Sequence, residues 1–488
     1  MPVFRFLIGP GARGRGHGGD DPAVGAIAPL NMPGPKPYTA REFPDAGSAM
    51  PHPDSRGLPL STSCEHAAAQ YRAGVDLLLS AWPGADAALD AAIAADPDFA
   101  LAHAARARLD AMRGAAATAR TRIAAAMEIV ARNGTARERG HVGVLSLVIH
   151  GRPAAALQAV RAHAASWPRD VVILGLPLGA FGLLAFSGMA DHDQARVDLC
   201  ERHAPHFAAD DWWFLAYRGW SHAENGAVVQ GRGLVERSLA LRPANANAVH
   251  ALAHAMVEGG AGAEVERLVH DWLPGYDRGG TLHGHLAWHA ALAALERGDI
   301  AAAIALHDAH VRPAASRGLP LNVLSDTVSL LWRMDAYGYP VPRAVWDEAA
   351  AYAAPLHPEA GFAFADVHMA MLHAATGDRA AVLRRTDALT AMVEAGTLAA
   401  GAVVPAICRA ALAFAAADYA GCVRLLEPLA SEVARIGGSG AQREIVEDTL
   451  LVALMRGGET RKARDLLHRR LRRRPSPRDA AWQDRLAG

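Results

Sequence analysis

The chain has 488 residues, of which 51% are hydrophobic and 20% are charged. Such a length exceeds the usual size of a single core, so we expect several domains or a repeat array, and the composition argues against global disorder. The 49 basic and 50 acidic residues nearly cancel. A chain without a positive field lacks the electrostatic footprint of a nucleic-acid-binding protein, so we expect no nucleic-acid partner.

The first fifty residues are rich in Gly, Pro and polar residues and have no period. We predict that residues 1–50 form a disordered leader. No signal-peptide pattern opens the chain, and its four cysteines are scattered without a CxxC pair. This cysteine usage is typical of reduced thiols, so we predict a cytoplasmic protein.

From Ser63 onward the pattern is helical and repeats itself. Small or apolar residues recur at helical spacing until a proline ends the helix, and the period is about 34 residues, as in tetratricopeptide repeats. Glycines mark the turn inside each repeat, namely Gly151, Gly188, Gly226, Gly260, Gly298, Gly338, Gly377 and Gly457. We predict an all-α, tetratricopeptide-type solenoid, a right-handed superhelix of about eleven helix pairs over residues 63–476, without strands.

One uncharged stretch, residues 171–186 (VVILGLPLGAFGLLAF), imitates a membrane span. It is shorter than the ~20 residues that a bilayer core requires, and it contains Pro177 and three glycines. We therefore predict a buried helix of the array and no contact with a membrane.

Two histidine pairs then stand about one repeat apart: His250 and His254 in AVHALAHAMVEGG, and His285 and His289 in HGHLAWHAALAALERGD. Residues four apart leave a helix on the same face, one turn above the other. Stacked imidazoles on two neighbouring alanine-rich helices indicate a functional site.

The segment from Trp212 to Gly377 contains five blocks, WWFLAYRGWSHAENG, ANAVHALAHAMVEGG, HGHLAWHAALAALERGD, SLLWRMDAYG and FADVHMAMLHAATGD. In order and spacing they resemble the signature blocks of the tetratricopeptide repeat protein 38 family. Together with the upstream DSRGLPLSTSCEHAAAQYRAGVDLLL, the resemblance covers roughly residues 54–390. It implies an all-helical superhelix with a common set of polar positions, but not a reaction, and it places the site within residues 212–377.

In tetratricopeptide arrays the second, fifth, ninth and thirteenth residues of each first helix face the concave groove. This phase predicts that the four histidines share one pocket with Glu224, Glu258, Asp366 and His368. Further ligand contacts are predicted at Trp213, Trp220, Asn247, Trp288 and Arg333. Trp288 is also typical of a packing wedge, and Arg333 is either an anion clamp or a buried partner of Asp326 or Asp335.

The last predicted helix, RKARDLLHRRLRRRPSPRD, is rich in arginine, which favours a solvated capping face over a nucleic-acid patch because the whole chain is neutral. Residues 477–488 follow it as a C-terminal tail.

The histidine cluster allows two chemistries. As a metal site, His250, His254, His285 and His289 could bind Zn²⁺ or non-haem iron. Without metal, the imidazoles could act with Glu258, Asp366 and His368 in general acid–base catalysis. The plain alternative is packing, since HxxxH also arises by chance in a chain with 23 histidines. HExxH, GxSxG and Walker motifs are absent, and no GxGxxG stands between a predicted strand and a helix.

Two functions remain open. The favoured one is a binding protein whose groove, lined by histidine, tryptophan and carboxylate side chains, holds a small molecule, a peptide or a protein partner, because repeat proteins most often act as binders. The alternative is an enzyme that uses the same histidines on a small amide- or amino-acid-like substrate.

Overall fold

The structure, a computed structural model, describes residues 52–487. The predicted leader, residues 1–50, lies outside the described residues. The rest is built from helices, and the described residues contain no β-strand, only an isolated bridge between Pro53 and Pro59. The all-α fold is therefore confirmed.

The helices follow one another in antiparallel pairs. In the N-terminal half they are α1 (Glu65–Leu79), α2 (Ala85–Ala95), α3 (Ala100–Met112), α4 (Ala116–Asn133), α5 (Ala136–Ile149), α6 (Pro153–Ser166), α7 (Val171–Leu174), α8 (His192–His203), α9 (Trp212–Glu224) and α10 (Val228–Leu241). In the C-terminal half they are α11 (Ala246–Glu258), α12 (Gly262–Trp272), α13 (His283–Arg297), α14 (Ile300–Leu306), α15 (Pro320–Ala336), α16 (Arg343–Ala353), α17 (Ala363–Ala375), α18 (Arg379–Glu394), α19 (Val403–Ala415), α20 (Tyr419–Leu426), α21 (Gly440–Arg456), α22 (Thr460–Arg473) and α23 (Pro477–Ala487). Helices α1 to α22 correspond to eleven successive pairs, one of them degenerate, as a helical-repeat solenoid requires.

Glycines set the geometry of the pairs. The turn after α9 passes through Gly226 at a φ of 90°, and the turn after α13 passes through Gly298 at 85°. Only glycine adopts this left-handed conformation without strain. The predicted turn glycines share it with one exception: Gly457 still has the helical φ of −81°, and the left-handed residue is its neighbour Gly458.

The apolar stretch 171–186 departs from the prediction. Only Val171–Leu174 are α-helical, and the chain then runs through turns to a short 3₁₀ helix at Ala185–Ser187. Gly175, Pro177, Gly179 and Gly182 explain this, because proline and closely spaced glycines disfavour a continuous helix. Leu174 and Leu178 are still buried, so the prediction of burial holds and that of a helix is wrong.

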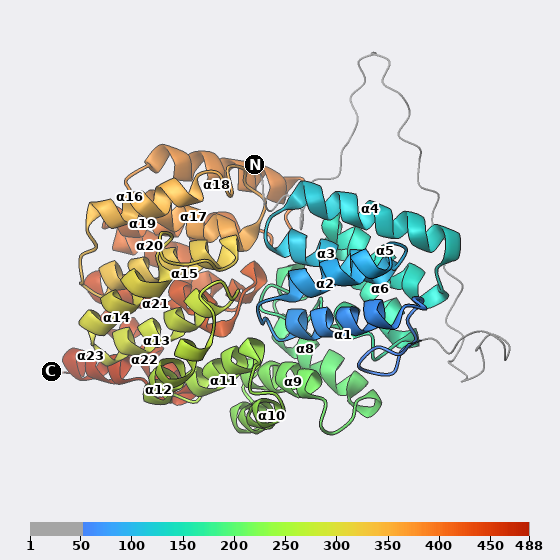
Figure 1. Cartoon of the computed structure of the whole chain (residues 1–488). Coiled ribbons are helices and arrows are strands. Elements are labelled where there is room, and N and C mark those ends of the chain that lie inside the picture. The colour runs from blue at the N-terminus through green and yellow to red at the C-terminus, as the bar shows by residue number, and fades with distance from the viewer. Residues whose placement is uncertain (1–51, 488) are drawn as a thin grey trace, which may run out of the picture.

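The solenoid curls until its last repeats touch its middle. In Figure 1 the blue and cyan helices α1–α6 lie on one side, the yellow to red helices α13–α22 lie on the other, and α9–α12 join them below. Arg443 at the start of α21 pairs with Asp193 of α8 at 2.6 Å, and Arg435 donates to Gly188 O at 2.8 Å. The inner space of the array is thereby closed by its own chain.

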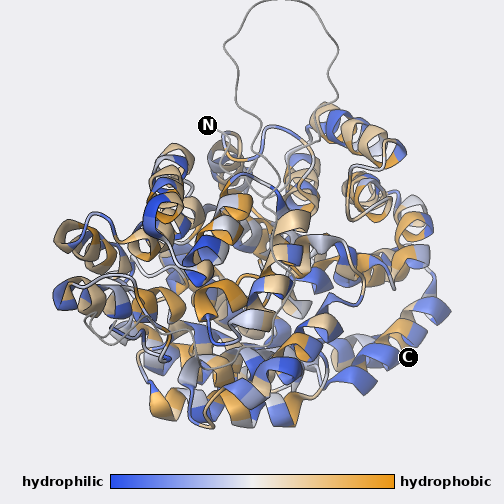
Figure 2. Cartoon of the chain, turned by 90° about the vertical axis from the view of Figure 1, so that its right-hand side faces the viewer, coloured by the Kyte–Doolittle hydropathy of each residue, from blue (hydrophilic) through white to orange (hydrophobic). Residues whose placement is uncertain are grey.

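The C-terminal helices are more than a solvated cap. Helices near the C terminus carry mostly hydrophilic residues (Figure 2), yet Arg470 of α22 is buried and bonds Asp448 at 2.9 Å and Asp479 at 2.6 Å. Residues 477–487, predicted as a tail, form α23, whose Trp482 packs edge-on against Tyr337. Within residues 52–487, none of the helices combines the length and the apolar character needed to cross a bilayer.

Candidate functional site

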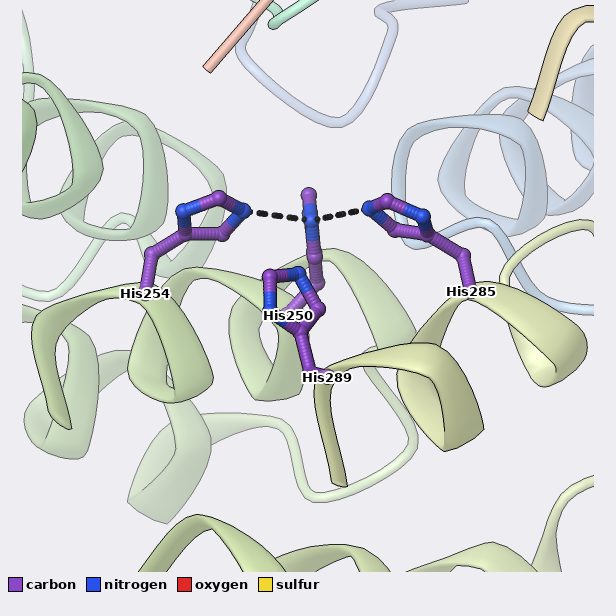
Figure 3. A group of neighbouring side chains, drawn as sticks. All are labelled: His250, His254, His285 and His289. Atoms are coloured by element: carbon purple, nitrogen blue, oxygen red, sulfur yellow. Dashed lines mark hydrogen bonds between the residues drawn. The ribbon is translucent and has the colours of Figure 1, made fainter. Parts of the chain in front are cut away.

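The two histidine pairs lie on α11 and α13, the first helices of adjacent repeats. Asn245 caps α11 by accepting a hydrogen bond from Ala248 N at 3.1 Å, which sets the phase of the helix. Most other buried residues of both helices are alanine, so the helices approach closely and their imidazoles meet (Figure 3). The structure thus brings His250, His254, His285 and His289 into one cluster.

The ring nitrogens of these four residues converge. His250 Nε2 lies 2.9 Å from His254 Nε2 and 3.0 Å from His285 Nε2 (Figure 3). One nitrogen from each of the four rings can be chosen so that all lie within 4.8 Å of one another. The His289 ring centre lies 4.5 Å from that of His254 and 4.9 Å from that of His285.

Two buried carboxylates hold the outer nitrogens of the cluster. Glu224 Oε1 of α9 lies 2.9 Å from His254 Nδ1, and Asp326 Oδ2 of α15 lies 2.8 Å from His285 Nδ1. The hydrogen bond to Asp326 fixes the hydrogen of His285 at Nδ1 and leaves its Nε2 lone pair free to point at a common centre. Glu224, in contrast, faces His254 Nδ1 at ion-pair distance. Glu224 also accepts a hydrogen bond from Gly440 N at 2.7 Å, at the first residue of α21.

Burial controls the ionisation of the cluster. Burial first, and the neighbouring histidines second, lower the pKa of His250 and of His289 well below the usual value, so both rings are neutral at pH 7. Burial raises the pKa of Glu224, but His254 outweighs this effect and the pKa stays below its ordinary value. Neutral imidazoles are the form that binds metal ions.

The hydrogen bonds of the cluster cannot all be made at once. An imidazole nitrogen carries either one hydrogen or one lone pair in the ring plane. His250 Nε2 therefore bonds either His254 or His285, although both nitrogens lie at hydrogen-bonding distance. Both ring nitrogens of His289 are buried without a hydrogen-bond partner. A cation at the common centre would satisfy the converging lone pairs together.

A cavity of about 310 Å³ adjoins the cluster. It lies between the end of α1, helices α3, α9 and α11, and the irregular segment that follows α7. His250 and His285 line it, whereas His254 and His289 do not. Most of the other lining side chains are apolar, as in ordinary small-molecule pockets.

The predicted tryptophans and Asn247 take different places. Trp220 and Asn247 line the cavity, and the Asn247 amide donates to Leu79 O at 2.7 Å. Trp288 is fully buried, stacks on His285 with ring centres 5.2 Å apart, and donates from Nε1 to Ser329 Oγ at 3.1 Å. Trp213 is buried but does not line the cavity. Trp213 and Trp288 are therefore packing residues.

Three of the predicted residues are held by other partners. Asp366 pairs with Arg385 and accepts from Gly361 N at 3.0 Å. His368 Nδ1 lies 2.7 Å from Phe364 O. None of Asp366, His368 and Arg333 lines the cavity. The predicted groove-facing positions do not bring these residues to the cavity, because the later repeats pack against the C-terminal helices and do not face an open groove.

Arg333 and Glu258 also lie beside charged residues of the C-terminal helices and away from the cavity. Arg333 bonds Asp448 of α21 at 2.8 Å, so it is a buried ion-pair partner, but of a residue that lies far along the chain from Asp326 and Asp335. Glu258 lies near the N-terminus of α21, 3.8 Å from Arg474, and burial raises its pKa to about 7. It does not line the cavity.

The sequence patterns missed several residues of the site. Asp326 was considered only as a partner of Arg333, although it holds His285. Arg108 and Tyr217 line the cavity from α3 and α9, and Gln442 reaches it from α21. No local pattern brings residues from such distant segments together, because only the curling of the array does so.

A second buried group contains His141, His163 and Asp170. Asp170 accepts from both imidazoles and from Arg137 Nε, each at 3.0 Å. Arg137 also donates to Asp54 Oδ2 at 3.0 Å, which fastens the segment before α1 to the array. A guanidinium already supplies the positive charge here, so this group is a structural ion-pair network.

No protein-family model matches the chain. Among solved structures, the chain is similar to the tetratricopeptide repeat domain of P58(IPK), with 13% identity over 81% of this chain and 99% of that chain and a TM-score of 0.20. It is also similar to the complex of Naa15/Naa10 bound to HypK-THB, with 13% identity over 82% of this chain and 62% of that chain and a TM-score of 0.20. At such TM-scores the whole molecules do not superpose, so the fold assignment rests on the helix order of this chain.

Proposed function

We propose that His250, His254, His285 and His289 bind a divalent transition-metal ion, Zn²⁺ or Fe²⁺, and that the protein is an enzyme whose metal ion acts on a small molecule in the adjoining cavity. The observation that carries this proposal is the convergence of three Nε2 atoms, with His250 Nε2 within 3.0 Å of both neighbours. Imidazole nitrogens suit these metals.

The charges around the cluster support a divalent ion. Glu224 and Asp326 are both buried and each lies against the outer nitrogen of one histidine. Two carboxylates balance the two positive charges of the ion, and they raise the basicity of the imidazoles that they hold. When bound, the ion would act as a Lewis acid that polarises an oxygen of the substrate or activates water.

The position of the cavity supports a small substrate. His250 and His285 line the cavity and so direct the metal centre toward it. A peptide in the concave groove fits less well, because α21 occupies the inner side of α15, where Trp332 donates to Thr449 at 2.9 Å and Arg333 bonds Asp448 at 2.8 Å. A small amide- or amino-acid-like substrate remains compatible with the volume of about 310 Å³.

Two wider assignments belong to the same proposal. The resemblance of residues 54–390 supports membership of the tetratricopeptide repeat protein 38 family. The four cysteines, Cys64, Cys200, Cys408 and Cys422, are all free thiols. Free thiols support a reducing compartment, the cytoplasm.

Elemental analysis of the purified protein tests the metal site. We expect one equivalent of zinc or iron per chain, and we expect His254→Ala and His285→Ala to lose it while remaining folded. His270→Ala is the matched control, because His270 is an exposed histidine of α12. A wild-type protein that takes up no transition metal, even after incubation with Zn²⁺ or with Fe²⁺ under anaerobic conditions, would refute the proposal.

A further inference from the structure

The cavity contains a cationic side chain without an acidic partner. Arg108 of α3 is half-buried and lines the cavity. Its Nη1 donates to Val172 O at 2.8 Å. Among the described residues, no carboxylate forms an ion pair with Arg108. A guanidinium that lines an apolar cavity without a counter-ion is a ready partner for an anion, so Arg108 points to an anion from outside the chain.

Tyr217 of α9 lines the same cavity. Its interaction with Arg108 is the only one with a charged group that affects its pKa, which burial raises. The phenol is therefore protonated at pH 7 and able to donate a hydrogen bond. A guanidinium and a phenol that line the same cavity are a suitable donor set for a carboxylate.

The other arginine that lines the cavity, Arg113, has an acidic partner. Arg113 follows α3 by one residue and also lines the cavity, but it is exposed and donates to Asp86 at 2.9 Å. Its charge is already balanced. The cavity thus has one unbalanced positive charge, which matches a monoanion and not a phosphate dianion.

Apolar side chains line the same cavity as this charge and the two histidines. Leu109, Leu145, Ile149 and Leu183 line the cavity together with Trp220. On α9, Tyr217 stands seven residues before Glu224, which corresponds to about 10 Å along a helix. Trp220 stands between them in sequence, and its ring meets that of His254 edge-on with centres 6.1 Å apart. One face of α9 thus runs from the unpaired charge to the histidine cluster.

We propose that the ligand of the cavity is an amphipathic monocarboxylate whose carboxylate binds Arg108 and Tyr217 and whose apolar body extends toward His250 and His285. The inference rests on the proposed function for the role of the metal, because it places the substrate's reacting end at the histidine cluster. It adds the substrate class, which the cluster alone does not indicate.

Calorimetric titration tests the proposal with defined probes, the saturated fatty acids from butanoate to dodecanoate and their primary amides. We expect the best acid to bind the wild-type protein about tenfold or more tightly than its amide, because a charge-assisted hydrogen bond is lost in the amide. Arg108→Met should abolish this difference and Tyr217→Phe should reduce it. Arg113→Met, the matched control, should retain it.

Arg108→Lys guards against a trivial folding defect, since it keeps the charge and should retain part of the preference for the acid. Equal binding of acid and amide by the wild-type protein, or an unchanged preference in Arg108→Met, would overturn the proposal. Failure of every acid in the series to bind would overturn it as well.

The metal-free variant His254→Ala separates the two proposals. If His254→Ala still prefers the acid while no form of the protein binds metal, the proposed function fails and the carboxylate site stands. If metal binds but the preference for the acid is absent, the carboxylate site fails and the metal centre stands.

Discussion

At the scale of single residues, the position of His285 depends on Asp326. The 2.8 Å contact between Asp326 Oδ2 and His285 Nδ1 selects the tautomer in which Nε2 is free to bind a metal. Burial raises the pKa of Asp326, and His285 opposes this effect. Asp326 thus stays ionised more readily because His285 is beside it, and a cation bound to His285 would stabilise the carboxylate charge further.

Asp326→Asn should therefore weaken metal binding without removing a ligand. We expect the metal affinity to fall about 10- to 100-fold, the usual effect of losing the partner of a metal-ligating histidine. Competition with a chromophoric chelator measures it. Asp335→Asn on the same helix is the control, because Asp335 is exposed. Equal affinities for both variants and the wild type would show that Asp326 does not orient the ligand.

Asp170 provides a prediction about stability and pH. Burial alone would raise its pKa, but His141 and Arg137 outweigh burial and hold the pKa well below that of an ordinary aspartate. A carboxyl group with a lowered folded-state pKa stabilises the fold above its unfolded pKa of about 4, and this stabilisation is lost as the pH falls toward the folded-state value.

Asp170→Asn should lower the free energy of unfolding by about 3 kcal/mol at pH 7, because it removes the fully buried counter-ion of Arg137 and leaves only the half-buried Asp54. The difference from the wild type should shrink below about pH 4. Urea denaturation at pH 7 and pH 3 measures both values. Asp98→Asn, which breaks an exposed pair with Arg132, should barely shift either midpoint. A difference that stays constant with pH would contradict the assigned ionisation.

At this scale the sequence predicted the residues that follow a helical period and missed those that do not. Spacing of four places His250 and His254 on one face, and the phase of the preceding repeat adds Glu224, which does contact His254. Arg108 could not be found in this way, because it lies on α3, six helices before α9 in the chain. It reaches the cavity only because the array curls back on itself.

At the scale of elements, the crossing of α9 and α10 depends on two glycines. A Cβ at Gly231 would lie 2.5 Å from Gly219 O and 2.7 Å from Ala223 N, which are backbone atoms that cannot move aside. On the same helix, Gly233 is exposed, and a Cβ there would meet no atom within 4 Å. Alanine substitutions at these two positions therefore distinguish the effect of helix packing from the effect of helix propensity.

Gly233→Ala should stabilise the protein by about 0.5–1 kcal/mol, the propensity difference between the two residues. Gly231→Ala should instead destabilise it by about 1–3 kcal/mol, because the overpacked crossing outweighs that gain. Thermal denaturation of both variants provides the comparison. Stabilisation by both substitutions would show that α9 and α10 do not approach so closely.

Element type was predictable where periodicity is long and failed where glycine and proline interrupt it. Eleven pairs follow from the repeat length, and left-handed glycines such as Gly226 close the first helices as expected. Residues 175–184 have the hydrophobicity of a helix but the glycine and proline content of a loop, and the backbone follows the latter. This segment then lines the cavity, a role that hydropathy could not indicate.

At the scale of the whole molecule, Glu224 links the histidine cluster to the closure of the array. One of its oxygens lies 2.9 Å from His254 Nδ1, and the other accepts from Gly440 N at 2.7 Å. Gly440 begins α21, whose N-terminus favours a negative charge. Arg443, one turn later, pairs with Asp193 of α8. The charge at the cluster and the contact between the last repeats and the middle of the array are thus connected through one carboxylate.

Removing the metal should therefore reduce the local stability of helices beyond those that carry its ligands. We expect a chelator to increase amide hydrogen exchange in α9, α11, α13 and the first turn of α21, and to leave α4 and α6 unchanged, because those helices share no contact with the cluster. A ligand present at a thousandfold excess over its Kd stabilises the binding state by about 4 kcal/mol, so the loss of protection should be large. Glu224→Gln should weaken the response at α21 more than at α13. A response confined to α11 and α13 would show that metal binding and closure of the array are independent.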